Sequence, residues 1–151
     1  MFNLDKKLIE NSYKKIIDSL GDYVDQKGVK DTPKRVANTY EELLSGYTAD
    51  IEKIINNALF DVEYDQIVIV KNIRFYSLCE HHILPFFGKI DIGYLPNSKI
   101  IGLSKIPRIT QVFSKRLQVQ ERLTEQIGKA IFENTNALGA GVVINAQHMC
   151  T

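Results

Sequence analysis

The chain has 151 residues, of which 44% are hydrophobic and 25% are charged, and its formal net charge at pH 7 is +1. This length fits one domain with a sizeable core, and the near-neutral charge excludes a global field that would attract nucleic acid or an anionic membrane. The first residues lack the basic and apolar regions of a signal peptide, and no apolar run approaches the roughly 18 residues that a membrane span needs. We therefore expect a single cytoplasmic domain, residues 1–151.

The first sixty residues have the apolar spacing of helices. In residues 4–20 the apolar side chains recur every three or four positions, with Asn3 as the expected N-cap and Gly21 as the stop. Two further helices are expected, one from Thr32-Pro33 to Gly46 and a short one after Asp50. The sequence thus predicts a helical N-terminal part, residues 1–60.

From residue 67 onward the pattern changes to alternation, the period of a β-strand. Residues 67–77 and 86–95 alternate in this way, with Ile73 and Ile90 on the faces expected to be buried. After these strands we expect a turn at 96–98, an extended segment at 100–103, helices at about 104–115 and 119–136, and a last strand that begins at Val142 after Gly139 and Gly141 end the second helix.

Every histidine and cysteine of the chain lies in one of two short segments, Cys79-Glu80-His81-His82 and His148-Met149-Cys150. These side chains can act together only if the fold brings residue 80 to residue 150. His148 and Cys150 have the same parity as the apolar residues that precede them in the last strand, so both should project from one face. A polar pair at the end of an inward-facing row indicates a site rather than a core.

Cys79 and His82 have the spacing at which a turn directs two side chains to one ion, and Cys150 would complete a Cys₂His set. Zinc with three protein ligands keeps a fourth position for water, as in catalytic sites, and lowers the pKa of that water to about 7. The alternatives are two unrelated buried thiols, or a structural zinc that uses another histidine. His81 and His148 would then be proton carriers or hydrogen-bonding partners of the ligands, and position alone does not separate these roles.

Two further motifs begin the two predicted C-terminal helices. Ser104-Lys105-x-x-Arg108 places backbone N–H groups and two cations in one helical turn, which suits phosphate, although such cations are more often solvated surface. Gln120 and Glu121 begin the next helix and could cap it. A carboxylate there could also accept the paired N–H groups of guanine, but the residues alone favour capping.

Together the motifs resemble type I GTP cyclohydrolase, the zinc enzyme that converts GTP to 7,8-dihydroneopterin triphosphate and formate at the start of pterin and folate biosynthesis. The resemblance covers about residues 30–151 and rests on Phe75-x-Ser77-x-Cys79-Glu80-His81-His82 with Pro85-Phe86, Ile101-Gly102-Leu103-Ser104-Lys105, Gln118-Val119-Gln120-Glu121-Arg122-Leu123-Thr124, and His148-x-Cys150. It implies an α+β tunnelling fold over residues 61–151, an antiparallel four-stranded sheet with two helices on one face, after N-terminal helices. It also implies a homodecamer of two stacked pentamers with active sites at subunit interfaces.

The resemblance also implies a role for each matching residue. The zinc ligands would be Cys79, His82 and Cys150, and the catalytic histidines would be His81 and His148. The triphosphate contacts would be Ser104, Lys105 and Arg108, and the guanine contacts would be Gln120 and Glu121. In the implied mechanism, zinc-activated water adds at C8 of the purine with His148 as proton donor, and His81 assists the later proton transfers.

The sequence departs from the family pattern in three places. Asn38 stands where some members have a basic phosphate contact, and Leu117 replaces a common proline. The family continues past His-x-Cys with a basic segment that includes a triphosphate-binding arginine, whereas this sequence ends at Thr151, so we expect a core that is cut short at its C-terminal end. The alternative function is a non-catalytic GTP-binding or assembly module. A zinc nucleobase deaminase would need a Pro-Cys-x-x-Cys motif, which is absent.

Overall fold

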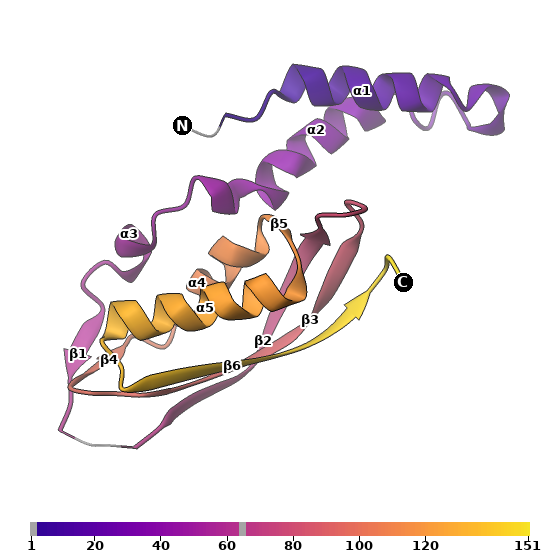
Figure 1. Ribbon diagram of the computed structural model, residues 1–151. Helices are drawn as coiled ribbons and strands as arrows, with labels where there is room; N and C mark the ends of the chain where they lie inside the picture. The colour runs from indigo at the N-terminus through magenta and orange to yellow at the C-terminus, as the bar shows by residue number, and fades with distance from the viewer. Residues whose placement is uncertain (1–2, 64–65) are drawn as a thin grey trace.

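The computed structural model describes residues 3–63 and 66–151, with helices in the N-terminal part and a sheet with two covering helices in the rest (Figure 1). The helices are α1 (Lys6–Asp18), α2 (Thr32–Leu43), α3 (Ile51–Ile55), α4 (Lys105–Ser114) and α5 (Gln120–Thr135), with 3-10 turns η1 (Gly21–Tyr23) and η2 (Ser45–Tyr47). The strands are β1 (Leu59–Asp61), β2 (Val68–Cys79), β3 (Pro85–Leu95), β4 (Lys99–Ile101), β5 (Leu117–Gln118) and β6 (Gly139–His148). Among the described residues, no helix is both long enough and apolar enough to span a membrane.

Four strands form one sheet in the order β5-β2-β3-β6. β3 pairs antiparallel with β2 on one side and with β6 on the other, and this register sets Phe86 opposite His148. The fourth strand, β5, has only two residues and runs parallel to the end of β2, where Gln118 pairs with Cys79. The predicted α+β fold is confirmed, but the fourth strand is a short parallel one, and β4 pairs with β1 in a separate two-stranded sheet.

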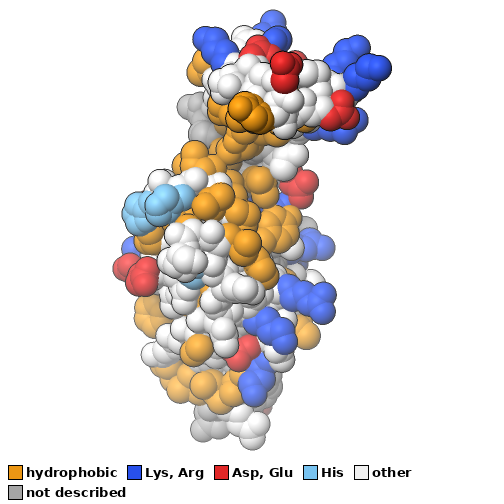
Figure 2. Space-filling model, turned by 90° about the vertical axis from the view of Figure 1, so that its right-hand side faces the viewer, with side chains coloured by type: hydrophobic (Ala, Val, Ile, Leu, Met, Phe, Trp, Pro, Cys, Tyr) orange, Lys and Arg blue, Asp and Glu red, His pale blue; other side chains and the backbone are white. Residues whose placement is uncertain are grey.

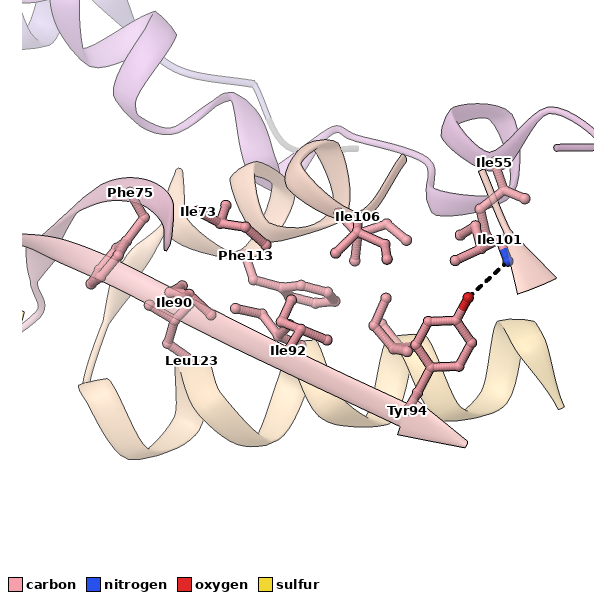
Figure 3. Close-up of a cluster of buried hydrophobic side chains, with 14 of the residues drawn as sticks. Ile55, Ile73, Phe75, Ile90, Ile92, Tyr94, Ile101, Ile106, Phe113 and Leu123 are labelled. Carbon is pink, nitrogen blue, oxygen red and sulfur yellow. Dashed lines mark hydrogen bonds between the residues drawn. The ribbon is translucent and has the colours of Figure 1, made fainter. Parts of the chain in front are cut away.

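The core lies between this sheet and the helices α4 and α5, which cover one face of it (Figure 1). The cluster of buried side chains is drawn from all of these elements and includes Ile73, Phe75, Ile90, Ile92, Tyr94, Ile106, Phe113, Leu123 and Ile127 (Figure 3). The predicted alternation is confirmed over residues 73–77 of β2 and 90–94 of β3, where every second side chain is buried. The hydroxyl of the buried Tyr94 accepts the Ile101 N–H at 3.2 Å, which attaches β4 to the core.

Two helix ends differ from those that the sequence predicts. Asp5, not Asn3, is the N-cap of α1, because its carboxylate accepts a backbone N–H of the first turn at 2.9 Å. Helix α5 ends at Asn136, whose φ of 50° is the left-handed conformation that often closes helices. Gly139 and Gly141, predicted to end that helix, lie in β6 instead.

Gly46 attaches the N-terminal helices to the core. It lies in η2, beyond the end of α2 at Leu43, and so does not itself close the helix as predicted. Its N–H donates to the Lys115 carbonyl at 3.0 Å, and its own carbonyl accepts from Arg116 Nε at 3.1 Å. A Cβ at this position would lie 2.0 Å from the Val112 carbonyl oxygen, so no side chain fits without a backbone shift.

We expect Gly46→Ala to lower the free energy of unfolding by about 1–3 kcal/mol, the usual cost of overpacking, measured by urea denaturation. Gly139→Ala is the matched control, because a Cβ there meets nothing within 4 Å, and its stability should stay within about 0.5 kcal/mol of the parent. Equal unfolding midpoints for the two variants would contradict the close approach at Gly46.

Candidate metal centre and substrate pocket

The two segments that contain histidine and cysteine meet at one end of the sheet. Cys79 is the last residue of β2 and His148 is the last residue of β6, with the first residues of β3 between them (Figure 1). The register of β3 with both neighbours therefore brings residue 80 close to residue 150. This confirms that the fold, rather than local sequence, assembles the group.

Cys79, His82 and Cys150 each offer one ligand atom, and these atoms all lie within 4.8 Å of one another. The Cys79 Sγ is 4.0 Å from His82 Nδ1, and both cysteines are free thiols. The two thiols are therefore not unrelated core side chains. Two sulfur donors and one imidazole suit a borderline-soft divalent ion, and three protein ligands leave a position open for water or substrate. The group could hold a metal ion.

The surroundings of the two thiols shift their pKa values in opposite directions. The backbone N–H of His81 and the side chain of His82 lower the pKa of Cys79 to about 6, so this thiol is mainly a thiolate at neutral pH. Burial raises the pKa of Cys150, and the adjacent Cys79 adds to that shift. The metal-free group therefore carries one thiolate and one thiol at pH 7, and metal binding must release the Cys150 proton.

The ligand turn, residues 79–84, is held by backbone hydrogen bonds. The Cys79 N–H donates to the Leu84 carbonyl at 2.8 Å, and the Ile83 N–H donates to the Cys79 carbonyl at 2.8 Å. Ile83 has a φ of 56°, a left-handed conformation that β-branched residues rarely adopt. Such a conformation persists only where the surrounding contacts enforce it, and it is commonest at functional sites.

The two histidines outside the ligand group lie in different surroundings. The His148 ring stacks on the buried Phe86 ring, with centroids 4.8 Å apart and planes at 6°. Its Nε2 lies 2.9 Å from Gln120 Oε1, and its Nδ1 lies 3.9 Å from Cys150 Sγ. His81, in contrast, has a side chain that is 65% exposed, and histidine side chains are visible at the surface in Figure 2. His148 is thus fixed in one orientation, whereas His81 faces solvent.

The ligand group opens into a cavity of about 330 Å³. Its lining includes the ligands, both other histidines, Phe86, the residues 118–121 and Thr151. Gln120 and Glu121, the predicted guanine contacts, therefore lie in the wall of the cavity that contains the metal ligands. Gln120 also donates through Nε2 to the Ile144 carbonyl at 3.2 Å, a contact with β6 that the sequence does not reveal.

Ser104, Lys105 and Arg108 do not line this cavity. They follow β4, which begins four residues after β3 ends, whereas the metal ligands lie where β3 begins (Figure 1). Lys105 and Arg108 instead line a separate groove of about 450 Å³, together with Thr48, Asp50 and Lys53. Within one chain, the predicted phosphate contacts and the predicted metal ligands therefore do not share one cavity.

Comparisons with known proteins point to one family. A family model described as GTP cyclohydrolase I matches residues 9–151. The chain is 51% identical over 145 residues to GTP cyclohydrolase 1 of Campylobacter jejuni strain 81-176, which covers 96% of this chain and 76% of the relative. It is 50% identical over 147 residues to the Hahella chejuensis protein of that name, with 97% and 77% covered. It is also 51% identical over 142 residues to the one from Leptospira biflexa, with 94% and 78% covered. The family model begins to match at residue 9, within α1, and so extends the similarity beyond the roughly 30–151 that the motifs cover.

Proposed function

The chain belongs to the GTP cyclohydrolase I family, and from this premise we propose which of its residues bind GTP and carry out the reaction. The activity of the family is the hydrolysis and rearrangement of GTP to 7,8-dihydroneopterin triphosphate and formate, and this protein is an enzyme of that class. The observation that supports the proposed site best is the meeting of Cys79, His82 and Cys150 at the cavity that Glu121 lines.

Zinc is the ion that we propose for this group. Two thiolates and one imidazole are among its preferred donors, and three protein ligands leave the open position that catalytic zinc sites have. When bound, zinc supplies a water molecule activated for attack at neutral pH. Both thiols must stay reduced for this role, which favours the cytoplasm as the place of action.

Glu121 is proposed to select guanine. One carboxylate can accept both the N1–H and the N2–H of that base, and adenine has no such pair of donors. Gln120, beside it in the cavity wall, is proposed as a second contact to the base. His148 holds its ring against Phe86 in the same wall and is proposed to donate a proton to the purine. The exposed His81 at the cavity is proposed to serve the later proton transfers.

The triphosphate is proposed to bind Ser104, Lys105 and Arg108 of a second copy of the chain. These residues lie outside the cavity that Cys79, His82 and Cys150 line, and Lys105 and Arg108 face a separate groove. This division between two hollows of one chain supports a site that two copies share. A closed homo-oligomer, which we propose to be a decamer of two pentamers, would repeat this shared site at every subunit interface.

The test of this function is incubation of the zinc-loaded protein with GTP, followed by measurement of formate and of a fluorescent pterin. We expect the two products in equal amounts, because each ring opening releases one formate. GTP binding without either product would favour the alternative function, a non-catalytic GTP-binding module.

Glu121→Ala is expected to raise the KM for GTP by about a hundredfold or more, because it removes two hydrogen bonds to a charged acceptor, each worth about 1.5–3 kcal/mol. Inosine triphosphate lacks the N2 amino group, so the preference of the parent for GTP over this analogue should largely disappear in the variant. Glu125→Ala, one turn further along α5 and exposed, is the control and should keep both the KM and the preference. An unchanged KM in Glu121→Ala would remove this residue from the base pocket.

A further inference from the structure

Three residues of the matched motifs have no part in the chemistry proposed above, and they contact one another. They are Glu80 in the ligand turn, Gln118 in β5 and Arg122 in α5. Arg122 donates one guanidinium N–H to the Glu80 carboxylate, and its Nε donates to Gln118 Oε1 at 3.1 Å. The Gln118 backbone carbonyl accepts the Glu80 N–H at 2.9 Å. These contacts form a closed triangle between the turn and the helix, the Glu80–Gln118–Arg122 cluster.

Gln118 is held in place more firmly than the other two members of this cluster. It is only 1% exposed, and both the nitrogen and the oxygen of its side-chain amide make hydrogen bonds. Its Nε2 donates to the Phe113 carbonyl at 3.0 Å and to Gln126 Oε1 at 2.8 Å. An amide nitrogen only donates and an amide oxygen only accepts, so Oε1 must point to Arg122. A buried amide is tolerated when its hydrogen bonds are made, and here a single orientation makes all of them.

The cluster is also attached directly to the first metal ligand. β5 pairs with β2 through only two residue pairs, and one of them joins Gln118 to Cys79. Further along the turn, the backbone of Ile83 is in the left-handed conformation, and it needs contacts from its surroundings to stay there. The hydrogen bonds of Glu80 to Gln118 and Arg122 are contacts of this kind, because they hold the turn between its two ligands.

We propose that the Glu80–Gln118–Arg122 cluster positions Cys79 and His82 as ligands before the metal ion arrives. This inference rests on the proposed metal site, although none of the three residues gives an atom to the ion. Residues that orient metal ligands from outside the coordination sphere reduce the loss of the ion. Retention of zinc should therefore depend on the contact between Arg122 and Glu80.

The experiment measures how fast zinc passes from the protein to a chelator in Arg122→Gln, in Glu80→Gln and in the double variant. Each single variant is expected to release zinc roughly 10- to 100-fold faster than the parent, the usual effect of removing a partner of a metal ligand. The double variant should release it no faster than the faster single variant, because both changes break the same contact. Lys129→Gln, which breaks an exposed ion pair with Glu133 on the same helix, is the control and should release zinc at the parent rate.

Two further readouts separate positioning from general stability. The KM for GTP at saturating zinc should stay at the parent value in Arg122→Gln, because neither Arg122 nor Glu80 lines the cavity. In Glu80→Gln the urea midpoint of the metal-free protein should shift no more than in Lys129→Gln, because the bond of Arg122 to the buried Gln118 is kept. Arg122→Lys should recover only part of the retention, because one ammonium cannot reproduce the planar fork that reaches both Glu80 and Gln118.

This inference would be overturned if both single variants released zinc at the parent rate. It would also be overturned if the rate increases of the two single variants multiplied in the double variant, and neither result would affect the proposed metal site. A parent protein that fails to bind zinc at all would instead refute the proposed metal site.

Discussion

Cys150→Ser is expected to remove the bound metal and the cyclohydrolase activity together. Cys79 and His82 come from one turn, and Cys150 is the candidate ligand that the second segment contributes. A serine hydroxyl stays protonated at neutral pH and is a poor zinc ligand, so the remaining pair would hold the ion weakly. Loss of a catalytic zinc forfeits several kcal/mol of transition-state stabilisation, so GTP turnover should fall by about a thousandfold or more.

Metal analysis after dialysis, together with formate release, checks this expectation. Met149→Ser is the matched control, because its side chain lies between the two functional residues but is 55% exposed. This variant should retain zinc and activity.

His148→Ala should separate metal content from activity. It should keep the metal, and its rate should fall roughly 10²–10⁴-fold, the usual contribution of a general acid. A full complement of zinc in Cys150→Ser would contradict the assignment of this ligand.

The second large effect is the recovery of activity when two inactive variants are assembled together. A variant that carries both Lys105→Ala and Arg108→Ala lacks the proposed triphosphate contacts, and His148→Ala lacks the proposed proton donor. Each should be nearly inactive alone. If the site is shared, then about a quarter of the interfaces in randomly mixed oligomers combine an intact cationic group of one chain with an intact metal end of another. We therefore expect about a quarter of the parent activity.

The mixed oligomers would be obtained by co-expressing the two variants with different affinity tags and purifying on both. The control mixture combines His148→Ala with Cys150→Ser, which both damage the metal end. Every cavity in that mixture is defective, so it should stay inactive. Failure of the first mixture to regain activity, or equal recovery in the control, would contradict a site that two chains share.

Much of the core could be predicted from the sequence, because burying one face of a sheet produces an alternation that is visible without coordinates. Ile73 and Ile90 are buried as that pattern predicts. The features that were missed have no periodicity to reveal them. β5 is two residues long and β1 three, whereas β4 overlaps the extended segment that was predicted at 100–103. The N-cap was misplaced because Asn3 and Asp5 are equally good capping residues.

The metal ligands were predictable for a different reason, which is that the chain confines its histidines and cysteines to two segments. Their distances confirm the grouping of Cys79, His82 and Cys150 as a set that could hold a metal ion. The placement of Lys105 and Arg108 could not be foreseen, because a motif gives the residues of a site but not which end of the sheet they occupy. The bond between Gln120 and His148 depends on the register of β6 against β3, which local sequence also leaves undefined.

The placement of Lys105 outside the cavity that Cys79 lines has a consequence for the behaviour of the proposed shared site on dilution. If the cations of one subunit serve the cavity of another, as we propose, then a lone subunit has no complete site. Turnover per polypeptide should then fall on dilution as the ring comes apart, and it should return on concentration, without any change in covalent structure.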